Sequence, residues 1–294
     1  MQVQQRTDLD LRGREIQLNT HAEMEHAYLT RFLTAPNLER LQMILAEALV
    51  RAAGLPPRVA NTVIAALLLI YHGLAVHDEI ETLTARDDER YRQLGVLAGD
   101  YYSSKYYRLL AEAGEIALIG QFARAVQQVN EARAELERDP SDFSLKTDRY
   151  QQSHETIQSA LLHSLRVHYL PEQPQWAMLI THLVRAQIQS RELESASTHI
   201  WARTLPNLTI WQKASGEERK YLKGLRTGER ADSRLLSLHV KYGTSSDLLQ
   251  ELDESLDLAG RTLDRMGEPL DDVRELCRQL TEYRPLPWRV VEEG

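Results

Sequence analysis

Residues 63–82 read Val-Ile-Ala-Ala-Leu-Leu-Leu-Ile-Tyr-His-Gly-Leu-Ala-Val-His-Asp-Glu-Ile-Glu-Thr. The first half of this stretch is apolar on every side, which is typical of a helix at the centre of a helical domain. Its unbroken apolar part, Val63 to Tyr71, is shorter than the roughly 20 residues that a membrane-spanning helix needs. The stretch therefore predicts a buried core helix that carries acids at its C-terminal end.

Helical periodicity continues on both sides of this stretch. Apolar residues recur every three or four positions, and no run of alternating β-branched residues or repeat of 30–50 residues interrupts them. The sequence predicts an all-α, single-domain bundle of about ten helices over residues 1–294, with residues 1–12 disordered. The expected helices are 38–52, 58–80, 91–113, 116–137, 142–169, 175–198, 230–241, 246–266 and 270–283. Residues 217–228 are expected to form a surface loop or a short helical turn.

Composition excludes several classes of protein. Hydrophobic residues make up 43% of the 294 residues, which is enough for a full core. The net charge of −8 argues against nucleic-acid binding, which needs a basic face. One cysteine, Cys277, allows no internal disulfide, and the polar first ten residues do not resemble a signal peptide. We expect a cytoplasmic protein without a transmembrane segment.

Residues 69–107 carry a family resemblance. A helix ending in acids is followed by a short loop and by a helix that reads Leu97-Ala-Gly-Asp-Tyr-Tyr-Ser103, then Tyr106-Tyr107. This layout resembles the trans-polyprenyl diphosphate synthases, and in particular the small subunit (component 1) of bacterial heptaprenyl diphosphate synthases. The resemblance implies an isoprenoid-synthase-like helical bundle and a catalytic large subunit as partner.

The first catalytic motif of that family is incomplete here. Where the family has Asp-Asp-x-x-Asp, which holds magnesium on a diphosphate, this chain has Asp78-Glu79-Ile80-Glu81-Thr82. Where the family has an Arg-Arg pair that binds diphosphate, this chain has Asp87-Asp88, which reverses the charge. We interpret Asp78, Glu79 and Thr82 as a relic of the metal site.

The second half of the family's site is missing as well. The lysine of its Lys-Thr pair is matched by Gln158, next to Ser159. The second aspartate-rich motif should lie within residues 179–195, where Glu192 and Glu194 are the only acids. We therefore expect no catalytic residue and no metal site in this chain, and Mg²⁺ in the catalytic partner. Asp78 and Glu79 are the two acids that could still take part in metal binding, and no substrate-binding residue is assigned.

With the scaffold preserved and the site incomplete, the resemblance implies a non-catalytic regulatory subunit of a heteromeric heptaprenyl diphosphate synthase in menaquinone side-chain synthesis. The expected partner is the catalytic large subunit, in a heterodimer, with a possible homodimer when the chain is alone. Interface candidates are Val96, Leu97, Tyr101 and Tyr102, on an apolar surface of about 2,000 Å² or more. One alternative is a stand-alone prenyltransferase or terpene-synthase-like enzyme with an atypical metal site. Another is a helical interaction protein unrelated to isoprenoids.

Overall fold

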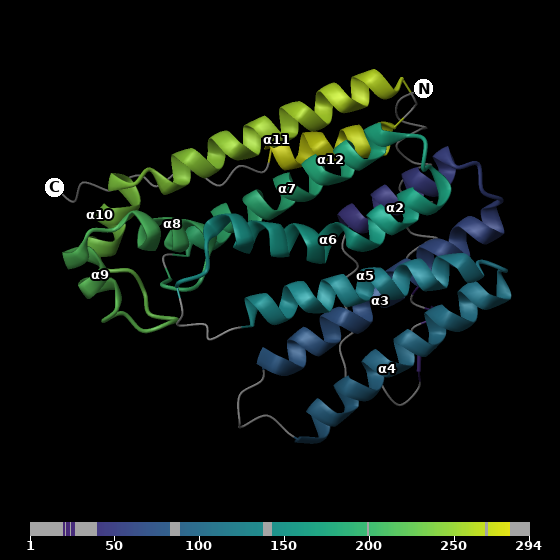
Figure 1. Cartoon of the computed structure of the whole chain (residues 1–294), viewed down its shortest axis with the longest axis horizontal. Coiled ribbons are helices and arrows are strands. Elements are labelled where there is room, and N and C mark those ends of the chain that lie inside the picture. Colours follow the sequence, from purple (N-terminus) through teal and green to yellow (C-terminus); the bar gives the residue numbers. More distant parts are fainter. Residues whose placement is uncertain are drawn as a thin grey trace. The chain divides into compact units, whose positions relative to one another are not determined.

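The computed structural model describes residues 20, 22–23, 25–26, 40–82, 89–137, 143–198, 200–267 and 270–282, without the side chains of 77–82 and 90–92. This described part contains eleven helices and no extended strand, so the predicted all-α class is confirmed (Figure 1). The helices are α2 (Arg40–Ala52), α3 (Pro57–Thr82), α4 (Glu89–Glu112), α5 (Ile116–Leu136), α6 (Thr147–Tyr169), α7 (Pro174–Ser197), α8 (Leu205–Lys213), α9 (Gly216–Leu222), α10 (Ser233–Lys241), α11 (Thr244–Met266) and α12 (Asp271–Glu282).

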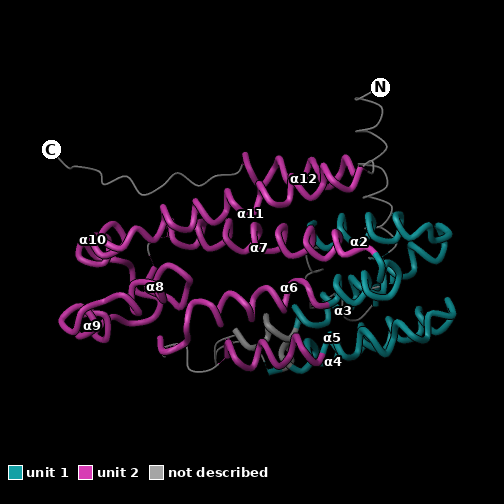
Figure 2. The backbone as a smooth tube through the Cα atoms, turned by 45° about the horizontal axis from the view of Figure 1, so that its top comes forward, with its two compact units in different colours: residues 1–126, 161–172 teal, residues 127–160, 173–294 magenta. Residues whose placement is uncertain are grey.

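The chain divides into two compact units, coloured teal and magenta in Figure 2. Unit 1 holds residues 1–126 and 161–172, and unit 2 holds residues 127–160 and 173–294. The prediction of one domain over residues 1–294 stays a prediction, and the stretch 1–12 lies outside the described residues.

Helix α3 forms the centre of unit 1. All residues from Val63 to Ile70 are buried, which confirms the predicted core helix. By length and composition Pro57–Val76 could cross a bilayer, but 67% of its most apolar window is buried, as in the core helix of a folded domain. Helix α4 packs along α3 at a close glycine contact. A methyl group placed on Gly73 would lie 3.4 Å from the carbonyl oxygen of Gly99.

Helices α7 and α11 form the centre of unit 2, where they pack against each other along their length. Trp176 on α7 is completely buried, and the apolar stripe of α11 runs through Leu248, Leu252 and Leu256 on its buried face. The Phe143 and Trp201 rings stack beneath α8 and α10, with their centroids 4.4 Å apart. This apolar core holds α6, α7 and α11 in place for the polar contacts described below.

The ends of the first two helices follow from turn chemistry. Helix α2 stops because Gly54 adopts a left-handed conformation (φ 68°), and the amide of Leu55 then donates to the carbonyl of Val50. Helix α3 begins directly at Pro57, whose fixed φ suits the first position of a helix and whose missing N–H is not needed there.

Candidate functional site

The acids of the first motif lie on the last turn of α3, whose backbone is helical through Thr82. The side chains of Asp78, Glu79 and Thr82 fall outside the described residues, as do Asp87 and Asp88. The interpretation of this motif as a relic therefore stays a prediction.

Glu192, from the stretch expected to hold the second motif, is buried at 8% exposure. Its carboxylate accepts a hydrogen bond from the Tyr150 hydroxyl at 2.9 Å and another from the Leu205 backbone N–H at 2.7 Å. Leu205 begins α8, so the carboxylate satisfies a free amide at a helix N-terminus, where a negative charge is also favoured. Burial raises the pKa of Glu192, while both hydrogen bonds oppose that rise. Glu192 therefore ties α6 and α7 to the start of α8.

His154 lies beside this tie, with its ring 4.4 Å from that of Tyr150. Burial, together with the nearby positive charges of Arg203 and Arg191, lowers the pKa of His154 from its ordinary 6.5 to about 4. The folded protein thus keeps this imidazole neutral.

The lowered pKa of His154 predicts a loss of stability in mild acid. The unfolded chain takes up a proton near pH 6.5, whereas the folded protein does so only near pH 4. The contribution of His154 to the free energy of unfolding is therefore complete above pH 6.5. It falls by about 3 kcal/mol as the pH drops to 4. In His154→Phe, which keeps a ring against Tyr150, the free energy of unfolding measured in urea should change less between those two pH values. An unchanged pH dependence in the variant would contradict the assignment.

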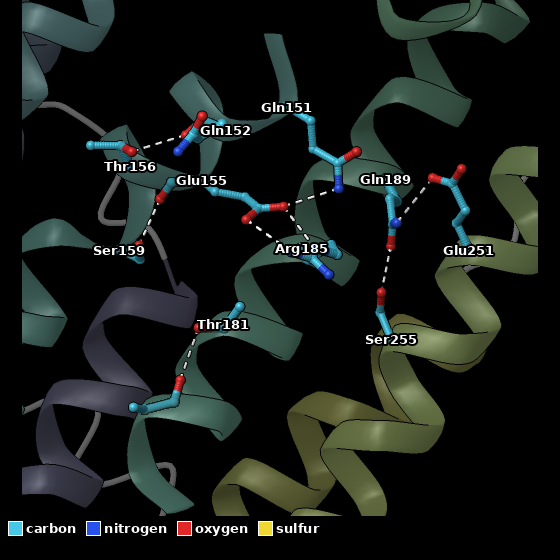
Figure 3. A network of polar contacts seen from close by, with 11 residues as sticks. Gln151, Gln152, Glu155, Thr156, Ser159, Thr181, Arg185, Gln189, Glu251 and Ser255 are labelled. Atoms are coloured by element: carbon cyan, nitrogen blue, oxygen red, sulfur yellow. Dashed lines mark hydrogen bonds and ion pairs between the residues drawn. The ribbon is translucent and has the colours of Figure 1, made fainter. Parts of the chain in front are cut away.

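A polar seam joins α6, α7 and α11 within unit 2 (Figure 3). Its members are Gln151, Glu155, Arg185, Gln189, Glu251 and Ser255. The guanidinium of Arg185 donates two hydrogen bonds to the carboxylate of Glu155, from Nε at 2.7 Å and from Nη2 at 3.1 Å. Gln151 adds a third at 3.0 Å. The two-pronged geometry is the strong form of an arginine–carboxylate pair, and it raises the pKa of Arg185 above its ordinary value.

The seam continues from α7 to α11 through the amide of Gln189. Its Nε2 donates to Glu251 at 3.4 Å, and its Oε1 accepts from the Ser255 hydroxyl at 2.9 Å. Burial raises the pKa of Glu251. On α6, the hydroxyl of Ser159 donates to the backbone carbonyl of Glu155 at 2.7 Å, so it too is engaged inside its own helix.

These contacts bear on the magnesium that the fold family implies. Mg²⁺ needs several hard oxygen ligands in nearly octahedral order, usually with water and substrate phosphate. The carboxylate of Glu192 is used by α8, and that of Glu155 is used by Arg185. The described residues of α6 and α7 therefore do not fit a magnesium site. Within the described part of the chain, no three His, Cys, Asp or Glu residues are grouped to hold a metal.

The four interface candidates on α4 differ in how far their side chains are exposed. Val96 and Leu97 are exposed, at 45% and 58%. Tyr102 is only 5% exposed, inside unit 1 beside Gly73, so its choice as a surface anchor needs correction. Tyr101 is half-buried, and its ring contacts that of His26 at 5.2 Å. The exposed face of α4 continues from Val96 to Tyr107, which is 44% exposed, lies eleven residues or about three turns further on, and was not among the interface candidates.

Several solved prenyl synthases have a similar fold. Decaprenyl diphosphate synthase from Rhodobacter capsulatus superimposes with a TM-score of 0.78 at 18% identity, covering 96% of this chain and 98% of that one. A Caulobacter crescentus polyprenyl synthase complexed with calcium and isoprenyl diphosphate gives 0.71 at 18% identity, covering 95% of both chains. The chain therefore has the isoprenoid-synthase fold, as the sequence predicted.

Sequence comparison assigns the chain to one family within this fold. A sequence profile of heptaprenyl diphosphate synthase (HEPPP synthase) subunit 1 matches residues 26–233, and the chain belongs to that family. It is also 40% identical over 127 residues to heptaprenyl diphosphate synthase component 1 of Geobacillus stearothermophilus. That match covers 42% of this chain and 53% of the relative, about half of the relative's length.

Proposed function

We propose that this chain is the non-catalytic, regulatory subunit of a heteromeric heptaprenyl diphosphate synthase. Its catalytic partner would be a large subunit with both aspartate-rich motifs, and the product would serve menaquinone side-chain synthesis in the cytoplasm. The observation that carries the proposal is the use of the carboxylates in unit 2. Within the stretch where the family's second metal site is expected, Glu192 holds α8, and on the neighbouring helix α6 Glu155 is paired with Arg185.

The internal pairing of these charges supports a scaffold role. A diphosphate carries several negative charges, which an enzyme neutralises with metal ions and unpaired cations. Arg185 is already neutralised by a carboxylate of its own chain, at a partly exposed position where such a pair contributes modestly to stability. In the proposed pair, the Mg²⁺ that activates the leaving diphosphate would be held by the aspartates of the catalytic subunit.

The exposed face of α4 supports assembly with that partner. Val96, Leu97 and Tyr107 give it exposed apolar and aromatic side chains among exposed polar and charged ones. Residues of this kind dominate the energetics of protein interfaces. The printed names of the family and of the relative, subunit 1 and component 1, agree with an enzyme of more than one chain.

Reconstitution tests the proposal directly. The purified chain with Mg²⁺, farnesyl diphosphate and isopentenyl diphosphate should give no product. Adding a catalytic large subunit should give long-chain prenyl diphosphate, and the two chains should elute together on gel filtration. Product from the chain alone would instead indicate the stand-alone enzyme. Separate elution at micromolar concentration, together with no gain in product, would overturn the subunit proposal.

A further inference from the structure

Two acids around helix α9, Glu218 and Asp232, are engaged in local structure. Glu218 caps the helix by accepting from the Ser215 amide at 2.8 Å, and it also pairs with Lys241 at 2.6 Å. The bond from Lys241 is the main cause that lowers the pKa of Glu218 to about 2. Asp232 caps α10 by accepting from the Leu235 amide at 2.9 Å. These two carboxylates are therefore tied to backbone amides at helix starts, whereas Glu217, in the first turn of α9, is exposed.

The cations that follow are placed differently. Residues 219–230 contain five basic residues and a single acid, Glu229, in a chain whose net charge is −8. Glu229 accepts from the Arg226 backbone amide at 2.9 Å, inside the turn. Four of the basic side chains are exposed. None of these four has a hydrogen-bond or ion-pair partner among the residues that the structure describes. We name them the basic loop: Lys220, Lys223, Arg226 and Arg230.

The backbone of the basic loop is held firmly to the rest of unit 2. The amide of Gly228 donates to the carbonyl of Trp201 at 2.8 Å, and the amide of Trp201 donates to the carbonyl of Glu229 at 2.7 Å. Ile200 and Arg230 form an isolated antiparallel bridge. Trp201 is itself buried against Phe143. The basic loop begins at Lys220 in α9 and continues beyond the end of that helix. Figures 1 and 2 both show α9 with α8 and α10 at one end of unit 2. The cations are thus presented on an ordered backbone and need little ordering to bind.

We propose that the basic loop docks this chain on an anionic phospholipid surface. Long, exposed and separately placed cations suit the diffuse charge of lipid headgroups, and each strengthens binding about fivefold when close to such a surface. The choice of a lipid over an acidic protein rests on the proposed function, because a heptaprenyl diphosphate has a long apolar tail that leaves water for a membrane. The attachment would be peripheral, reversible and sensitive to salt.

Vesicle co-sedimentation tests this inference with the full-length chain. We expect binding to vesicles that contain phosphatidylglycerol, none to pure phosphatidylcholine, and release at about 0.5 M salt, where the Debye length is only a few ångströms. Lys223→Glu/Arg226→Glu should weaken binding more than about tenfold. The matched control, Arg124→Glu/Arg265→Glu, changes two other exposed arginines and the net charge equally, and should stay within about twofold.

Three outcomes would overturn the proposal. They are absent binding to anionic vesicles, equal losses in both double variants, and complete release by inorganic pyrophosphate at matched ionic strength, which would indicate a site for a free phosphate compound. Selective binding to an acidic protein without vesicle binding counts as the first of these. Activity of the reconstituted pair in detergent should be the same for both variants. A failure of lipid docking therefore stays distinguishable from a failure of the subunit proposal.

Discussion

Leu97→Asp is expected to weaken assembly with the proposed catalytic subunit strongly and to lower the synthesis of long-chain product with it. Leu97 is 58% exposed on α4, next to Val96, so the substitution should leave the isolated chain folded. In the complex, an aspartate at this place would be desolvated without a partner, which costs several kcal/mol at the centre of an interface. We expect the dissociation constant to rise by about 30-fold or more, measured by titration calorimetry or analytical ultracentrifugation.

Leu258→Asp is the matched control for this experiment. Leu258 is 42% exposed on α11 in unit 2, and the same charge there should leave assembly and activity within about twofold, as for a surface position outside the interface. Equal losses in both variants would indicate a general effect of charge. If Leu97→Asp assembled fully, α4 would not be part of the interface. A charge at Tyr102 cannot serve this test, because that residue is buried and its substitution would disturb unit 1 itself.

Glu192→Ala is expected to destabilise the isolated chain by about 3 kcal/mol. The substitution leaves the Tyr150 hydroxyl and the Leu205 amide buried without an acceptor, and each unsatisfied group costs about 1–3 kcal/mol. The substitution also removes the cost of burying the Glu192 carboxyl, whose pKa is raised by burial, and this offsets part of the loss. The free energy of unfolding should be measured in urea at neutral pH, with and without Mg²⁺.

Glu194→Ala is the control, since Glu194 is the other acid of the same stretch and is only half-buried. We expect a change within about 0.5 kcal/mol, as for an ordinary surface position. A structural tie and a metal ligand predict opposite results for Glu192. If Glu192 were a ligand, removing its charge would cost little without metal, and added Mg²⁺ would stabilise only the parent chain. That pattern would overturn the structural role assigned here.

Local sequence signals predicted most of the helices because each depends on its own residues. The apolar run Val63–Ile70 is buried on all sides, and α5 and α7 begin and end within one residue of the expected positions. Gly54 and Pro57 act within one turn of chain, so their effect on α2 and α3 can be derived without tertiary contacts. Helix α8 was missed, although Thr204 followed by Pro206 is a start signal for a short helix.

The roles of the polar residues could not be derived in the same way. The tie between Glu192 and the start of α8 joins positions 13 residues apart across a turn, and its second donor, Tyr150, is 42 residues away. Glu155 and Arg185 are 30 residues apart, and periodicity does not determine which side chains of two packed helices meet. The inward position of the Tyr102 side chain also depends on a residue of another helix, because Gly73 on α3 leaves room for it.

The glycine contact between α3 and α4 also closes the space between these two helices. At Gly73 the two helices leave space for one methyl group, which would already touch the Gly99 carbonyl at 3.4 Å and the Tyr102 Cβ at 3.6 Å. An isoprene unit carries a branched five-carbon skeleton and cannot thread between atoms at ordinary van der Waals separation. No growing hydrocarbon can therefore pass between α3 and α4 at this level. If the proposed two-chain synthase forms, the contact at Gly73 is therefore not part of the path that its growing hydrocarbon follows.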